Sequence, residues 1–125
     1  MFPSGWRRVG SYTSSVATEA AAERSAPQCD AALTNAFALL GKRWNGMILG
    51  ALISGPAGFS EIRRALDSIS DSVLADRLAE LTAAGLVLRE VDNGPPVGVR
   101  YRLAEPGVAL VPVLRDLMDW ARNNL

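Results

Sequence analysis

The spacing of apolar residues changes once along this chain, at Gly85, and that change limits the folds it can adopt. Before Gly85, apolar residues recur every three or four positions, which is typical of helices that bury one face. After Gly85, residues 86–91 are rich in apolar and β-branched side chains, and residues 99–104 alternate apolar with polar ones. The intervening DNGPPVG predicts the turn of a hairpin. The chain is therefore expected to form several helices, one hairpin and a last helix.

The first two helices are expected in residues 30–40 and from Lys42 onward. Asp30 suits the N-cap of the first helix. The second carries one apolar stripe, expected to face the core, formed by Trp44, Met47, Ile48, Ala51 and Leu52. Gly46 and Gly50 cost helix stability, but their spacing permits another backbone to approach closely.

The third and fourth helices are expected in residues 59–66 and 70–84, joined by a short turn. Ser70 suits the N-cap of the fourth, and Gly85 suits its end. On a helical wheel its inward side carries Val73, Leu74, Arg77, Leu78 and Leu81. Arg77 is expected to bury its stem there and pair with a carboxylate. The outward side carries Asp71, Ser72, Ala75, Asp76 and Ala79. These side chains are short, so a surface could approach this helix closely.

A last helix is expected from Glu105 nearly to the end, with a kink or break at Pro112. Its broad apolar face is the candidate dimer interface and comprises Leu110, Val113, Leu114, Leu117, Met118, Trp120 and Ala121. Residues 1–28 show little apolar periodicity and are assigned to an N-terminal tail, in which residues 15–25 could form a short helix. Residues 29–125 form the second unit, a single folded domain.

The residue types present argue against several functions. The 125 residues include no histidine and one cysteine, Cys29, so the usual metal ligands and the commonest general base are missing. We expect no metal, no cofactor and no enzymatic activity. No apolar run is long enough to span a membrane, and no secretory signal is recognisable, so a cytoplasmic location is expected. Formal net charge is zero, so a nucleic-acid partner would have to be attracted by local clusters of cations.

Two helices joined by a short turn and followed by a hairpin predict an α+β, mostly α fold, the winged helix-turn-helix with a two-stranded wing. The chain from Cys29 to Ala121 also resembles the HxlR-type family of bacterial winged-helix transcription regulators, relatives of the MarR group. The resemblance is carried by LLGKRWNGMIL, GFSEIRRAL, ISDSVLADRLAELTAAGLVLRE, VRYRLAEPG and LVPVLRDLMDW. It implies a C-terminal dimerisation helix and a homodimer whose two recognition helices enter successive major grooves of a palindromic operator in double-stranded DNA.

In that arrangement the fourth helix reads base edges and cations on neighbouring elements hold the phosphates. Carboxylates can accept from the cytosine amino group, and serine can bond to several bases. The candidate DNA-binding residues are Lys42, Arg43, Ser60, Arg63, Arg64, Ser70, Asp71, Ser72, Ala75, Asp76, Arg100 and Arg102. Asp71 is either a base contact or a first-turn helix stabiliser.

Cys29 is a candidate redox sensor. It precedes a helix, where the helix dipole favours a thiolate, although Asp30 beside it opposes this effect. Several members of the resembled family sense oxidants or electrophiles through a cysteine at this place. The alternative is that Cys29 is an inert small apolar residue.

The function predicted from the sequence is a dimeric DNA-binding transcription regulator, acting as a repressor and responding to oxidants or electrophiles through Cys29. Two alternatives remain open. One is a regulator that responds to an apolar small molecule bound at the dimer interface. The other is a winged-helix module that binds protein through its acidic helix face.

Overall fold

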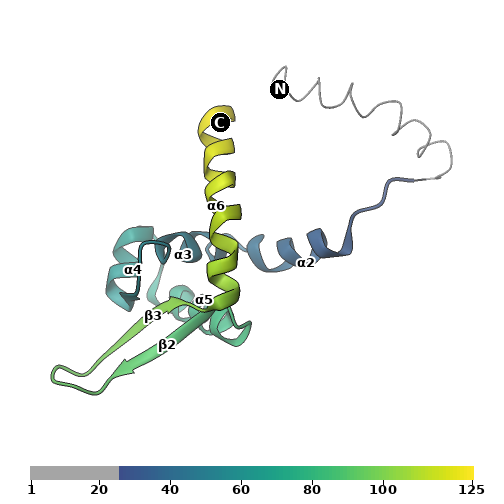
Figure 1. The fold of residues 1–125 in the computed structure, drawn as a ribbon. Coiled ribbons are helices and arrows are strands. Elements are labelled where there is room, and N and C mark those ends of the chain that lie inside the picture. The colour runs from purple at the N-terminus through teal and green to yellow at the C-terminus, as the bar shows by residue number, and fades with distance from the viewer. Residues whose placement is uncertain (1–25) are drawn as a thin grey trace.

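The computed structural model describes residues 26–125, shown as a ribbon in Figure 1. Most of the expected tail, with its possible helix, lies outside these residues. The elements in chain order are α2 (Ala31–Leu40), α3 (Asn45–Ala51), β1 (Ala57–Gly58), α4 (Phe59–Leu66), α5 (Asp71–Ala83), β2 (Val87–Asp92), β3 (Gly98–Leu103) and α6 (Glu105–Asn124). The predicted winged helix-turn-helix is confirmed: α4 and α5 form the helix pair, and β2 and β3 form the wing.

The sheet has one more strand than the sequence analysis expected. Its order is β1-β3-β2, and both pairings are antiparallel. The short strand β1 pairs Ala57 with Tyr101 and Gly58 with Arg100. Because β1 runs directly into α4, this pairing fixes the start of the helix pair against the base of the wing.

Side chains of α3, α4, α5, α6 and the base of the sheet form the core. Its fully buried side chains are Ile48, Leu49, Leu52, Ile62, Leu74, Leu78, Leu81 and Val87. Burying a side chain of this size stabilises a fold by about 1.5–3 kcal/mol relative to exposure. Since α5 supplies three of these residues, its inward face is anchored firmly, and the other face is left to solvent.

The end of α5 confirms the role predicted for Gly85. The N–H of Gly85 donates to the carbonyl of Thr82 and the N–H of Leu86 donates to that of Leu81, which is the Schellman arrangement. Gly85 has φ = +81°, a conformation that residues with a Cβ rarely adopt. The chain thereby leaves α5 and enters β2 within a few residues.

The prediction for the second helix was partly wrong. α3 begins at Asn45, so Lys42 lies in the preceding turn. The residues that α3 buries are Asn45, Ile48 and Leu49, whereas Met47 is exposed. The buried face is therefore rotated from the predicted stripe. Such a rotation is possible because the amide of Asn45 has hydrogen-bond partners inside the fold.

Of the kink or break predicted at Pro112, the break is absent, because α6 runs continuously from Glu105 to Asn124. Pro112 has no N–H to donate to the carbonyl of Val108, so one backbone hydrogen bond of the helix is missing. Both residues are exposed, so that carbonyl can face solvent. In Figure 1 the C-terminal half of α6 stands clear of the other elements. Within residues 26–125, no helix has both the length and the apolar character needed to cross a lipid bilayer.

Candidate nucleic-acid interface

The turn between α4 and α5 sets the direction of the second helix of the pair. Asp67 and Ser68 adopt positive φ values of 46° and 47°, which bend the chain sharply. The Oδ1 of Asp67 accepts from the N–H of Ser68 at 3.0 Å. Ser70 then caps α5, because its Oγ accepts from the N–H of Val73 at 3.2 Å. The first helical turn of α5 is therefore held rigidly where the loop from α4 ends.

The outward face of α5 is exposed, as the sequence predicted. It presents Asp71, Ser72, Ala75, Asp76 and Ala79, opposite the buried leucines of the same helix. The hydroxyl groups of Ser70 and Ser72 lie 3.4 Å apart. Ser60 is exposed in the first turn of α4. A helix with short polar and small side chains along one exposed face can approach another surface closely.

Most of the candidate cations contact other groups of the same chain. Arg63 Nη1 lies 3.3 Å from Asp71 Oδ1, so the ion pair joins the two helices of the pair. On the wing, Arg102 Nε lies 2.9 Å from Glu90 Oε2. Arg100 donates to the carbonyl of Pro56 at 3.2 Å. These pairs are exposed, where an ion pair contributes about 0–1 kcal/mol, so a phosphate could replace the carboxylates.

The remaining candidate cations lie elsewhere. The guanidinium of Arg43 stacks over the ring of Trp44, 4.6 Å from its centroid. Lys42 forms an ion pair with Glu80 of α5. Arg64 is exposed on α4 and makes no ion pair or side-chain hydrogen bond with the described residues. That all six cations bind DNA stays a prediction.

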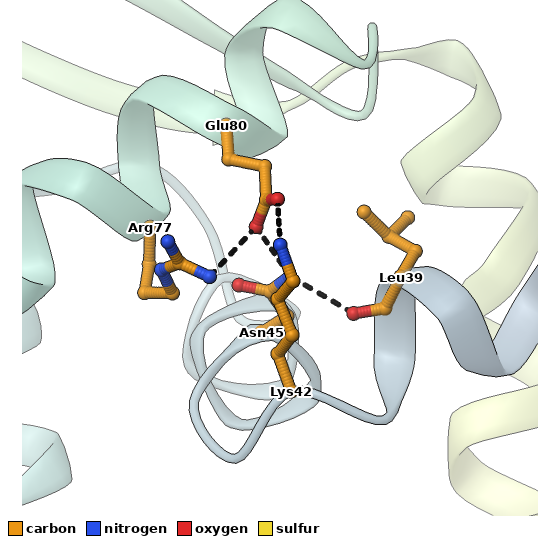
Figure 2. A network of polar contacts seen from close by, with 5 residues as sticks. All are labelled: Leu39, Lys42, Asn45, Arg77 and Glu80. Atoms are coloured by element: carbon orange, nitrogen blue, oxygen red, sulfur yellow. Dashed lines mark hydrogen bonds and ion pairs between the residues drawn. The ribbon is translucent and has the colours of Figure 1, made fainter.

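A polar network connects α5 to the turn before α3 (Figure 2). Asn45 is fully buried, and its Nδ2 donates to the carbonyl of Leu39 and to Glu80 Oε1, both at 2.9 Å. Arg77 Nη1 donates to the same carboxylate oxygen at 3.0 Å, and Lys42 pairs with the other oxygen. The carboxylate predicted to pair with Arg77 is thus Glu80. The network holds the middle of α5 to the segment that links α2 and α3.

The hydrogen bond that Asn45 donates to Glu80 lowers the pKa of that carboxyl below its ordinary value. The hydrogen bond from Lys42 and the positive charges of Arg77 and Lys42 act in the same direction. A carboxylate with a lowered folded-state pKa stabilises the fold above its unfolded-state pKa, and this contribution is lost as pH falls through the folded-state value. The stability advantage of the wild type over Glu80→Gln is therefore expected to shrink steadily below the ordinary carboxyl pKa. Urea unfolding of both proteins at a series of pH values measures this. A constant difference from neutral to acid pH would contradict the assignment.

Asn45 and Glu80 were not among the residues predicted from the sequence. An asparagine within an apolar run was the only available signal, since a polar residue there requires buried partners. Glu80 is 35 positions away in sequence, so the contact could not be found without the fold.

Cys29 is exposed just before α2. The hydroxyl of Thr34 donates to its Sγ at 3.5 Å, and Asp30 caps α2 by accepting from the N–H of Ala32 at 2.7 Å. The thiol is therefore accessible from solvent and lies at the N-terminal end of a helix.

The apolar face of α6 is mostly exposed within residues 26–125. Leu114 belongs to the core, Leu110 and Ala121 are half-buried, and the other predicted interface residues are exposed: Val113, Leu117, Met118 and Trp120. On α2, Leu33 and Phe37 are also exposed, Phe37 to 61%. A Cβ added at Gly46 or at Gly50 would meet no atom within 4 Å apart from the adjoining part of its own helix, so no other described backbone approaches these glycines. The close approach predicted there does not occur within residues 26–125.

Comparison with known proteins agrees with this architecture. Residues 39–125 match the model of the HxlR-like helix-turn-helix family. The HTH-type transcriptional regulator YodB of Bacillus subtilis (strain 168) is 45% identical over 89 residues, which are 71% of this chain and 80% of YodB. The crystal structure of quinone-bound YodB from B. subtilis has a TM-score of 0.66 at 40% identity and covers 76% of this chain and 99% of its own.

A second solved regulator has the same fold. The redox regulator HypR in its oxidized form has a TM-score of 0.70 at 33% identity, and the match covers 74% of this chain and 96% of HypR. The family consists of transcription regulators and not of enzymes. The helix pair, the wing and these matches together show that the chain belongs to the HxlR-like helix-turn-helix family of DNA-binding transcriptional regulators.

Proposed function

We propose that this protein is a homodimeric repressor that binds a palindromic duplex operator and releases it when Cys29 reacts with an oxidant or electrophile. The observation that carries the proposal is the exposed face of α5, with its short side chains held rigidly by the capped turn after α4. A recognition helix of this kind reads base edges in the major groove. Arg63 and Arg64 on α4, and Arg100 and Arg102 on the wing, would contact phosphates.

Selection of bound duplexes from a random pool tests the DNA-binding part. We expect a palindrome whose half-sites are about one helical turn apart, because the two helices of a symmetric dimer enter successive major grooves. Affinity for the selected duplex should fall steeply with salt. Absence of any enriched sequence at low ionic strength would contradict the proposal and favour a protein partner for the acidic face of α5.

The dimer is supported by the uncovered apolar side chains of α2 and α6. A hollow of about 390 Å³ between α3 and α6 is lined by Leu40, Arg43, Gly46, Met47, Gly50, Leu114, Leu117 and Met118. A second copy of α2 or α6 seated there would cover the two glycines and the exposed methionines. Sedimentation equilibrium should give twice the chain mass at micromolar concentration, and a monomer at that concentration would contradict the assignment.

The sensing role is supported by the exposure of Cys29 and by the relatives: YodB has been crystallised bound to a quinone, and HypR is a redox regulator with an oxidized form. An oxidant that takes two electrons and two protons would join the Cys29 thiols of two subunits in a disulfide. A quinone would instead add the thiol across its conjugated double bond, with the thiol proton passing to the ring. Neither reaction requires a second cysteine in the chain.

We expect Cys29→Ser to bind the selected duplex like the wild type and to stay bound when diamide or a benzoquinone is added. The wild type should lose most of its binding under the same treatment, and only diamide-driven loss should be reversed by dithiothreitol. Electrophoretic mobility shifts measure both effects. Equal release of the two proteins would remove Cys29 from the sensing role, and release of Cys29→Ser by an apolar compound would favour the ligand-responsive alternative.

A further inference from the structure

A hollow of about 420 Å³ lies between α5 and the wing. Arg89 of β2 and Tyr101 of β3 line its wing side, and they are directly opposite each other in the strand register. Its α5 side is formed by Ala75, Leu78, Ala79, Thr82 and Ala83. The alanines are exposed. The exposed side chains on the helix side of the hollow are therefore short, and the wing side carries a cation.

Arg89 differs from the wing arginines that the sequence analysis selected. Side chains alternate between the two faces of a strand, and directly paired residues share a face. Arg89 thus shares a face with Tyr101, on the side of α5, whereas Arg100 and Arg102 point to the other face. Arg102 lines a separate hollow, with residues of the segment between α3 and β1 and of α6. Of the three, Arg89 is the cation beside the recognition helix.

The charge of Arg89 is not neutralised within the described residues. It takes part in none of their ion pairs or side-chain hydrogen bonds, and no carboxylate lines the hollow. Glu90, its neighbour in sequence, points to the opposite face and pairs with Arg102. An exposed guanidinium over a floor of alanines is suited to an anion with a flat or tetrahedral set of oxygens.

We propose that Arg89 binds a backbone phosphate of duplex DNA at this hollow. The inference rests on the proposed function. When α5 enters the major groove and the wing lies along the flanking minor groove, one sugar–phosphate strand separates the two grooves and must pass between the two elements. That is the position of the hollow. The alanines of α5 let the strand approach, and Arg89 donates to the phosphate oxygens.

The test compares Arg89→Gln with Arg115→Gln, which removes an exposed arginine of α6 that likewise makes no ion pair with the described residues. Binding to the duplex selected by the wild type is measured between about 50 and 200 mM salt. Each lost phosphate contact lowers the slope of log K against log salt by about 1, so Arg89→Gln should lower it by about 2 in a dimer. Affinity should fall at least about tenfold at the lower salt concentration. Arg89→Lys, which keeps the charge, should retain the slope, and Arg115→Gln should match the wild type.

The outcomes separate this inference from the proposed function. If the wild type binds its duplex and Arg89→Gln shows the wild-type slope and affinity, the phosphate contact is wrong and the regulator assignment stands. If the wild type prefers no duplex, both are wrong. Urea unfolding of Arg89→Gln should match the wild type, since the side chain is exposed, and a large loss of stability would assign Arg89 a structural role instead.

Discussion

Replacing Asn45 by aspartate is expected to lower the free energy of unfolding by at least about 3 kcal/mol, the usual effect of an unpaired buried charge. The change removes both hydrogen bonds that the Asn45 amide donates, to the Leu39 carbonyl and to Glu80. It also places a carboxylate next to that of Glu80. No described donor reaches Asn45 Oδ1, and the neighbouring cations Lys42 and Arg77 already pair with Glu80. Urea unfolding at neutral pH measures the effect.

The control for this prediction is Asn93→Asp, the same chemical change at an exposed position of the wing turn, which should alter stability by less than about 0.5 kcal/mol. The difference in free energy of unfolding between the wild type and Asn45→Asp should also become smaller in acid. The introduced carboxyl group is more easily protonated when folded than when unfolded, so the folded variant gains protons, and hence stability, as pH falls. A loss of less than about 1 kcal/mol in the free energy of unfolding, or a loss that grows in acid, would show that the Asn45 amide does not bridge α5 and the α2–α3 turn.

The second large effect is expected on DNA binding. Ala75→Glu adds a long acidic side chain to the centre of the exposed face of α5. Like charges brought together at an interface cost several kcal/mol, and each dimer would carry two such side chains. Affinity for the selected duplex should therefore fall at least about 100-fold, which corresponds to about 2.7 kcal/mol. Titration with a labelled duplex, in a mobility-shift or anisotropy assay, gives the ratio.

Ala109→Glu is the matched control, because it makes the same change at an exposed position of α6 away from the helix pair. Glutamate favours helix nearly as well as alanine, so neither variant should lose more than a few tenths of a kcal/mol of stability. Comparable affinity of the two variants would show that this face of α5 is not opposite DNA. A protein partner for the face would then be the better hypothesis.

Local signals in the sequence were sufficient to predict the helix pair and the wing. The Ser70 cap, the leucine spacing of α5 and the glycine stop at Gly85 all act within a few residues, and each has the predicted contact in the structure. The alternation in residues 99–104 likewise fixed which side chains of β3 share a face. These features depend on short-range sterics and hydrogen bonds, which a single sequence displays directly.

Features that depend on distant partners were missed or misplaced. Met47 was expected inside and Asn45 was not considered, because the partners that hold the asparagine, above all Glu80, become neighbours only after folding. The strand β1 is two residues long, too short for any periodicity to be visible. Arg89 was passed over because its face of the wing depends on the pairing register with β3. Whether the selected residues contact DNA depends on a partner molecule, and the experiments above decide it.

The ion pairs of Arg63, Lys42 and Arg102 with carboxylates of their own chain have a consequence for the search along a genome. At these three cations an arbitrary stretch of duplex gains little, because each phosphate must first displace a carboxylate. Only a site that also forms base contacts with the recognition helix would offset the loss of those ion pairs. Few molecules would then be held on unrelated chromosomal DNA, and a small cellular pool would be enough to occupy its target.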